Sequence, residues 1–239
     1  MAPKIIVSYD GTDADHDALA YGRVLADAGA EVSLAYVRHT SRSERRREEL
    51  EHDDAERLLE RGAQLLGIPG VQRHVVLSAS TGEGLGKLAD QVGADAVIFG
   101  SEYRTATGHV QPGNSVQRLL AGGPVAIGIA PAGLRHEAAS RITTVGLVAE
   151  AGDEAAQATA ATLAASGDAG VTTATDDVDL LVIGSRPEAP QGHVMISSSA
   201  QRKLDEASSP VLVVPRGRPV RFGEGSRSAP APDPAPITA

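Results

Sequence analysis

Three residues near the middle of the chain have types suited to binding an anion. Gly113, Asn114 and Ser115 come directly before an apolar helical segment. The first N–H groups of a helix lack backbone partners, and the positive end of the helix dipole lies there, so this position favours a phosphate. Glycine allows close approach, and Ser115 offers a hydroxyl. Asn and Ser are also common as plain helix caps, so the triplet predicts either a phosphate site or an ordinary N-cap.

Alternating strand-like and helix-like segments must position this triplet. Short apolar runs indicate strands at 4–9, 32–37, 71–77, 96–99 and 125–129, with helices between them and after 115. This alternation predicts an α/β fold with an open, doubly wound parallel sheet of five strands in residues 1–135. Ligands of such sheets bind at the carboxyl ends of the strands, where strand order reverses. The residues expected there are Ser8, Tyr9, Asp10, Val37, Gly100 and Ser101.

The second half of the chain repeats the first. The segments ADAVIFGSEYRTATGHVQPGNSVQRLL and VDLLVIGSRPEAPQGHVMISSSAQRKL share Gly-Ser, Gly-His-Val and Gln-Arg at a constant offset, as from Gly100 to Gly184. The second copy, residues 140–217, has room for few elements between its first helix and the strand near 180. We therefore expect a shortened repeat with a three-stranded sheet that packs on the first copy or on another subunit. Residues 218–239, rich in Pro and Ala, are predicted to be a disordered tail.

Composition excludes several classes of protein. The absence of cysteine excludes disulfide scaffolds and thiolate chemistry. The net charge of -9 argues against nucleic acid as a partner. No apolar run reaches the roughly 18 residues of a membrane span, and the first residues lack the features of a signal peptide, so we expect a cytoplasmic protein with no membrane partner.

Two other groups of polar residues could suggest chemistry. His109 and His193 occupy equivalent positions of the repeat, but neither has a carboxylate or a second histidine at ligand spacing, so a loop hydrogen bond is the expected role. Asp13, Asp15 and Asp17 alternate along the chain without the glycine turn and final glutamate of a calcium loop. They are interpreted as the acidic first turn of a helix, and no metal site is predicted.

The spacing after the fourth expected strand resembles the universal stress protein family. Nucleotide-binding members carry Gly-x2-Gly-x9-Gly-Ser/Thr there and an aspartate at the end of the first strand. Gly100, Tyr103 and Gly113 stand at the three glycine positions, and Asp10 at the aspartate position. The resemblance covers residues 4–131 as a full unit and 141–216 as a degenerate one, as in tandem members.

The resemblance implies an adenine nucleotide site in the first unit. Asp10 and Val37 would lie near adenine and ribose, and Gly100, Ser101, Gly113, Asn114 and Ser115 would line the ribose and phosphates. Tyr103 departs from the pattern, and its ring either narrows the approach to the phosphates or points outward. The second unit has Gly184, Pro187 and Ser197 at the glycine positions, so no nucleotide is expected there.

The function implied is a non-enzymatic stress-response protein that binds ATP or a related nucleotide, with Mg²⁺ as an optional companion and an unidentified protein as partner. No Walker lysine is present, so any hydrolysis should be slow. The alternatives are a dimerising scaffold that binds no nucleotide and a weak ATPase. The family's fifth strand usually mediates pairing, which implies contact between 125–129 and 211–214 within one chain, or a homodimer.

Overall fold

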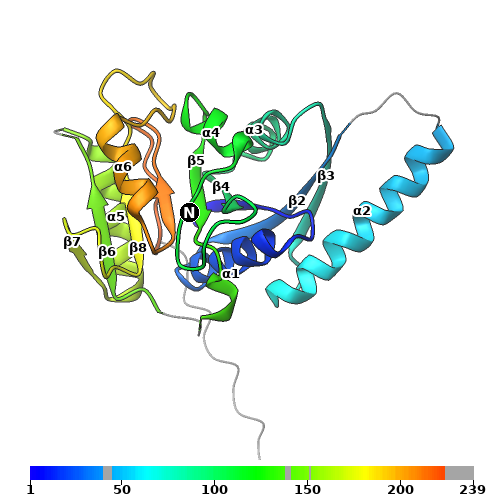
Figure 1. Cartoon of the computed structure of the whole chain (residues 1–239), viewed down its shortest axis with the longest axis horizontal. Coiled ribbons are helices and arrows are strands. Elements are labelled where there is room, and N and C mark those ends of the chain that lie inside the picture. The colour runs from blue at the N-terminus through cyan, green and yellow to red at the C-terminus, as the bar shows by residue number, and fades with distance from the viewer. Residues whose placement is uncertain (40–44, 138–140, 151, 224–239) are drawn as a thin grey trace, which may run out of the picture.

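The computed structural model describes every residue except 40–44, 138–140, 151 and 224–239. Strands and helices alternate along the chain (Figure 1). The strands are β1 (Lys4–Ser8), β2 (Glu31–His39), β3 (Gln72–Ser78), β4 (Ala96–Gly100), β5 (Ala126–Ala130), β6 (Thr144–Val148), β7 (Gly170–Thr172), β8 (Leu180–Ile183) and β9 (Val211–Val213). The helices are α1 (Asp13–Asp27), α2 (Arg45–Leu66), α3 (Thr81–Val92), α4 (Asn114–Leu120), the 3-10 turn η1 (Leu134–His136), α5 (Glu154–Gly167) and α6 (Ser198–Glu206).

All nine strands form one sheet that runs through the whole molecule. Its order is β3-β2-β1-β4-β5-β9-β8-β6-β7. Pairing is parallel on each side of a single antiparallel contact between β5 and β9, which is centred on Gly128 and Leu212. The five-stranded parallel sheet expected in the first half is confirmed, and so is the pairing of the segments around 127 and 212 within one chain.

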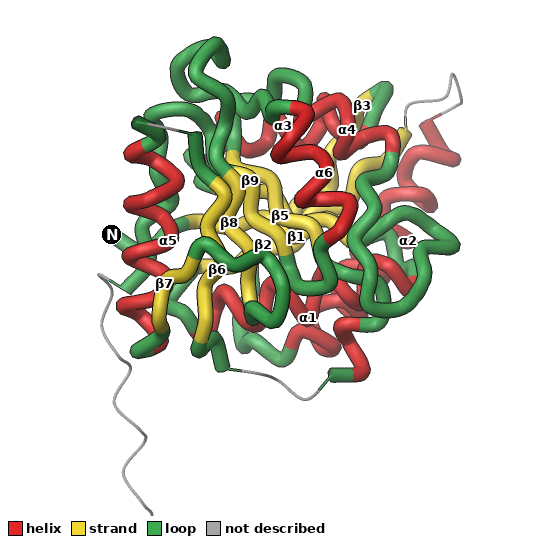
Figure 2. Tube along the Cα trace, turned by 60° about the vertical axis from the view of Figure 1, so that its left-hand side comes forward, coloured by secondary structure: helices red, strands yellow, loops and turns green. Residues whose placement is uncertain are grey.

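Helices cover both faces of this sheet in two continuous layers (Figure 2). Side chains of α1, α2 and α5 share one apolar core, and those of α3, α4 and α6 share the other. Alternation along β1 explains how one strand serves both cores, because Val7 faces the first and Ile6 the second. None of the helices in the described part of the chain is long and apolar enough to span a membrane.

The second half has one more strand than we expected. Its sheet contains β7, a strand of three residues that pairs with β6 between Val145 and Val171. The prediction of three strands is wrong because so short a strand, with Val171 half exposed, leaves no apolar run in the sequence.

The boundary of the C-terminal tail also needs correction. Residues 215–223 form a strap that crosses back over the protein. In the strap, Val220 and Phe222 are buried in the core that contains α1 and α5, and a guanidinium nitrogen of Arg218 lies 3.7 Å from a carboxylate oxygen of Asp95. Two apolar residues among prolines and arginines gave no periodic signal, so this end of the predicted tail is wrong. The rest of it, residues 224–239, lies outside the described residues.

Candidate functional site

The loop after β1 contains Asp10 at the carboxyl edge of the sheet. Gly11 turns the chain with φ of +87°, a conformation that side chains disfavour. The N–H of Thr12 donates to Asp10 Oδ1 at 3.1 Å, and the N–H of Asp10 donates to Asp15 Oδ2 at 2.5 Å. Asp10 itself is exposed, so its carboxylate is held by the turn yet open to a ligand.

The pKa values of Asp15 and Asp10 are shifted in opposite directions. Burial, followed by the hydrogen bond and charge of Asp10, raises the pKa of Asp15 to about 8. A hydrogen bond from the Asp15 carboxyl lowers the pKa of Asp10. At neutral pH the pair therefore carries its negative charge on exposed Asp10, with the buried partner protonated.

Gly100, at the end of β4, packs directly against the start of α1. A Cβ atom at this position would lie 2.0 Å from the carbonyl oxygen of Ala14, inside the first turn of the helix. The close approach brings the loops after β1 and β4 together. The glycine is thus required by backbone packing, whether or not a ligand binds.

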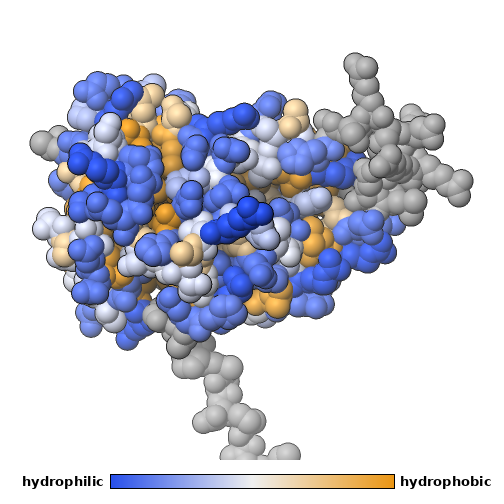
Figure 3. All heavy atoms as spheres, viewed as in Figure 1, coloured by the Kyte–Doolittle hydropathy of each residue, from blue (hydrophilic) through white to orange (hydrophobic). Residues whose placement is uncertain are grey.

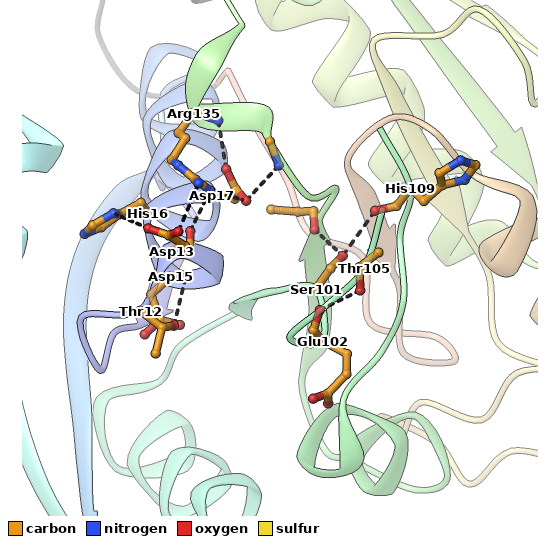
Figure 4. Close-up of polar contacts among 12 residues, drawn as sticks. Thr12, Asp13, Asp15, His16, Asp17, Ser101, Glu102, Thr105, His109 and Arg135 are labelled. Carbon is orange, nitrogen blue, oxygen red and sulfur yellow. Dashed lines mark hydrogen bonds and ion pairs between the residues drawn. The ribbon is translucent and has the colours of Figure 1, made fainter. Parts of the chain in front are cut away.

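Ser101 is not available to a phosphate, contrary to what the resemblance implied. It is buried, and its hydroxyl donates to the Ala130 carbonyl at 2.7 Å (Figure 4). The same hydroxyl accepts from the Gln111 N–H at 3.2 Å. These bonds fix both ends of the loop 101–111 to β5. Ser185 makes the equivalent bonds to Val214 and Met195, at 2.7 and 3.2 Å.

Tyr103 points outward, which resolves the two alternatives for its ring. The residue is 78% exposed, and the Arg104 guanidinium lies 5.6 Å from the ring centroid. A cation over an aromatic face at this distance is attractive. The ring therefore leaves the approach to α4 open.

The first turn of α4 is free of side-chain caps. Gly113 is its N-cap and makes no capping hydrogen bond, Asn114 is exposed and Ser115 is half-buried. A Cβ atom at Gly113 would lie 2.7 Å from Glu102 Oε2. Figure 4 shows the Glu102 side chain pointing away from Ser101, toward this helix. A carboxylate therefore lies where the resemblance implies phosphates.

Tyr9 and Val37 do not face one common pocket. Tyr9 is buried in the core under α1 and α2, where its ring touches the Gly62 position and its hydroxyl lies 3.4 Å from His16 Nε2. Val37 belongs to the opposite core, against Gly84 of α3. The expectation that both side chains surround one ligand is wrong because neighbouring strand positions face opposite ways. Ser8 is half-buried at the end of β1.

The acidic residues at the start of α1 have different roles. Asp13 and Asp15 occupy its first turn, as expected. Asp17 is buried, accepts the N–H groups of Gly133 and Arg135 at 2.9 Å, and pairs with the Arg135 guanidinium at 3.0 Å (Figure 4). It therefore anchors the connection between the two halves of the chain. Among the described residues, no group of three potential ligands could hold a metal ion.

The repeated Gly-His-Val triplets join the two halves. The N–H of Val110 donates to the Ala207 carbonyl at 3.2 Å, and that of Val194 donates to the Gly123 carbonyl at 2.8 Å. Both valines are buried. The backbones of His109 and His193 accept hydrogen bonds from Ala132 and Arg216, both at 3.0 Å, in agreement with the expected loop role.

Sequence reasoning missed two residues of this region, Glu102 and Asp15. Glu102 sits inside the glycine pattern at an unconstrained position, so no spacing rule singles it out. Asp15 looked like one more acidic residue at a helix start, although its position five residues after Asp10 was a usable signal. Its burial depends on how α1 packs.

An open, mainly parallel sheet with helices on both faces defines a Rossmann-like α/β protein. The sequence profile of the universal stress protein family matches residues 1–131, and the chain belongs to that family.

Solved structures show the same fold over nearly the whole chain. A universal stress protein from Archaeoglobus fulgidus DSM 4304 is similar with a TM-score of 0.68 and 14% identity, covering 90% of this chain and 98% of that one. A protein of unknown function from Pseudomonas aeruginosa PAO1 has a TM-score of 0.55 at 14% identity, covering 90% and 93%. None of the curated proteins matches the sequence.

Proposed function

We propose that the protein is a non-enzymatic regulator that binds ATP or a related adenine nucleotide at the carboxyl edge of its first half, in the cytoplasm. The observation that carries this proposal is the uncapped first turn of α4. Its free N–H groups start at Gly113, at the end of the loop that follows Gly100. Asp10 lies in the loop after β1, the strand next to β4, and would accept hydrogen bonds from the nucleoside.

Glu102 makes the phosphate end of this site dependent on a cation. Its carboxylate lies beside Gly113 and would repel phosphate oxygens. Carboxylate and phosphate oxygens are the ligands Mg²⁺ prefers, so a bound ion would convert this repulsion into a bridge. Glu102 and the phosphates would hold the ion.

We further propose that residues 1–135 are a complete domain and residues 140–217 a truncated copy of it. The hydrogen bonds of Ser101 and Ser185, and the reciprocal bonds of Val110 and Val194, support a common ancestry because equivalent atoms bond at the same offset. The copies pair inside one chain through β5 and β9.

A scaffold without a ligand is the second candidate. It is favoured by one observation, the full use of the Ser101 hydroxyl inside the protein, which removes an expected phosphate contact. On this alternative, the repeat is kept only because it joins the two halves.

Calorimetry with ATP tests the proposal. Wild-type protein should bind one equivalent in the presence of Mg²⁺. Gly113→Val should weaken binding at least about tenfold, because a branched side chain blocks the approach to the helix N–H groups. Glu102→Gln should strengthen binding about three- to tenfold without Mg²⁺, equivalent to roughly 0.7–1.4 kcal/mol.

Ala106→Val is the matched control, since Ala106 is an exposed residue of the same loop. It should bind as wild type does. No heat from any of these proteins, with or without Mg²⁺, would select the scaffold. Phosphate release that disappears in Asp10→Ala would show instead that the protein is an ATPase.

A further inference from the structure

A cavity lies beside α1, between the two halves of the chain. Its volume is about 670 Å³, within the range of small-molecule sites. The first half contributes one stripe of α1, from His16 to Asp27, with the end of α2 and η1, and the second half contributes Val178, Asp179 and the loop 208–210. Asp10, Gly100 and Gly113 do not line it, so it is separate from the nucleotide site proposed above.

Apolar side chains form one part of the cavity wall, beside polar and charged ones. Leu19, Leu66 and Leu134 are buried behind it, and Val24 lines it on α1. Leu65, which also lines it, is 62% exposed. Figure 3 shows hydrophobic surface interrupting the polar surface in the region where α1, η1 and the end of α2 meet. Leu65 therefore adds exposed apolar surface to the cavity wall.

Three of the charged groups around the cavity, Arg23, Arg135 and Asp179, already have partners. Arg23 lies 3.4 Å from the Asp27 carboxylate and donates to the Leu66 carbonyl at 3.1 Å. Arg135 is held by Asp17 and Asp13, and Asp179 accepts N–H groups of Thr143 and Thr144 at 2.7 and 2.9 Å. A ligand charge placed at any of these three groups would have to displace an existing partner, so they favour an uncharged ligand.

Ser209 leaves one polar atom without a partner at the wall. The residue is 8% exposed and borders the cavity. Its hydroxyl makes no hydrogen bond within the described part of the protein. A buried hydroxyl without a partner is unfavourable, so a ligand group that hydrogen-bonds to it would be stabilised.

We propose that this cavity binds an uncharged small molecule with an apolar body and one hydrogen-bonding group. The leucines and Val24 contact the apolar body, and the Ser209 hydroxyl pairs with the polar group. Because the cavity is formed by both halves, such a ligand bridges them and stabilises their docking.

Nile red tests this proposal, since it is uncharged, mainly apolar and carries a carbonyl group. Titration of the full chain should give saturable fluorescence with a stoichiometry of one. Ala20→Trp fills the cavity from α1 and should weaken binding at least tenfold, whereas Ala161→Trp, at an exposed alanine of α5, should leave it unchanged. Ser209→Ala should weaken binding about three- to tenfold, as expected for one hydrogen bond.

Leu65→Lys guards against misfolding of the filled variant, because an exposed position tolerates a charge. It should also weaken binding, with the far-ultraviolet circular dichroism of the wild type. Unsaturable fluorescence, or equal affinity in the wild type, Ala20→Trp and Leu65→Lys proteins, would overturn the proposal. ATP titration is expected to be unaffected by Ala20→Trp, so this result is independent of the nucleotide site.

Discussion

The loops that follow β4 and β8 have the same internal hydrogen bonds but different exposed side chains. In both loops a buried serine bonds to the neighbouring strand, and a buried valine bonds across to the other half. Yet Glu102 is matched by Arg186, Tyr103 by Pro187 and Gly113 by Ser197. The two loops share the hydrogen bonds that hold their backbone in place. They differ in the residues that would contact a ligand.

The two helix starts show the same division. The first turn of α4 has no side-chain cap, whereas the Ser197 hydroxyl caps α6 by accepting from the Ala200 N–H at 3.2 Å. In the second half, a side chain therefore bonds to a helix N–H group whose equivalent the first half leaves open. The residues that repeat in the two halves make the hydrogen bonds that hold the halves together. The residues that differ lie where a ligand could bind.

The largest expected effect separates two equivalent glycines. An added Cβ at Gly100 meets the backbone of Ala14, while at Gly184 it meets the carboxyl group of Asp153, which can rotate away. Gly100→Ala should therefore lower the free energy of unfolding by about 3 kcal/mol and Gly184→Ala by about 1 kcal/mol. Urea unfolding of both variants measures this difference, and equal losses would mean that α1 adjusts more easily than its packing indicates.

The two buried serines should behave alike. Ser101→Ala and Ser185→Ala each leave a buried carbonyl and a partly buried N–H without their partner. Each change should cost about 1–2 kcal/mol of unfolding free energy. Thermal or urea unfolding measures both losses. Clearly different losses would show that the equivalent hydrogen bonds do not stabilise the two halves equally.

A smaller effect, found in the first half alone, depends on pH. The pKa of Asp15 is raised to about 8 in the folded protein and is near 3.8 when unfolded, so the folded state binds more protons between these values. The unfolding free energy should fall as pH rises from 6 to 9, by at least about 1 kcal/mol. Asp15→Asn should reduce this slope, and Asp13→Asn, at an exposed carboxyl of the same turn, should not. A wild-type stability that rises over this interval would contradict the assignment.

Much of the fold could be predicted from local pattern. Runs such as Lys4–Ser8 are apolar enough to indicate a strand, and the resemblance to the family implied the pairing of β5 with β9. Short elements could not be found in this way. The strand β7 and the buried Phe222 depend on contacts with distant segments. A strand of three residues or a single aromatic side chain is too short to give a periodic hydrophobic pattern.

The candidate site was predicted in position more than in detail. Asp10 and Gly113 lie in the loops expected of them, since strand ends in a parallel sheet share one edge. The orientation of side chains was harder to predict. The Ser101 hydroxyl bonds to β5, the Tyr9 ring packs in the core under α1 and α2, and the Glu102 carboxylate lies beside the first turn of α4. Each orientation is decided by packing with residues far away in sequence.

The strap that ends at Gly223 affects the order in which the protein can fold during synthesis. Phe222 belongs to the core that includes α1, and Arg218 donates to the Ala94 carbonyl at 3.1 Å. These contacts cannot form until more than two hundred residues have left the ribosome, so the first half emerges with part of its surface uncovered. Contacts of such sequence separation slow folding. The nascent first half should accordingly expose an apolar surface, a natural target for chaperones, until the strap closes over it.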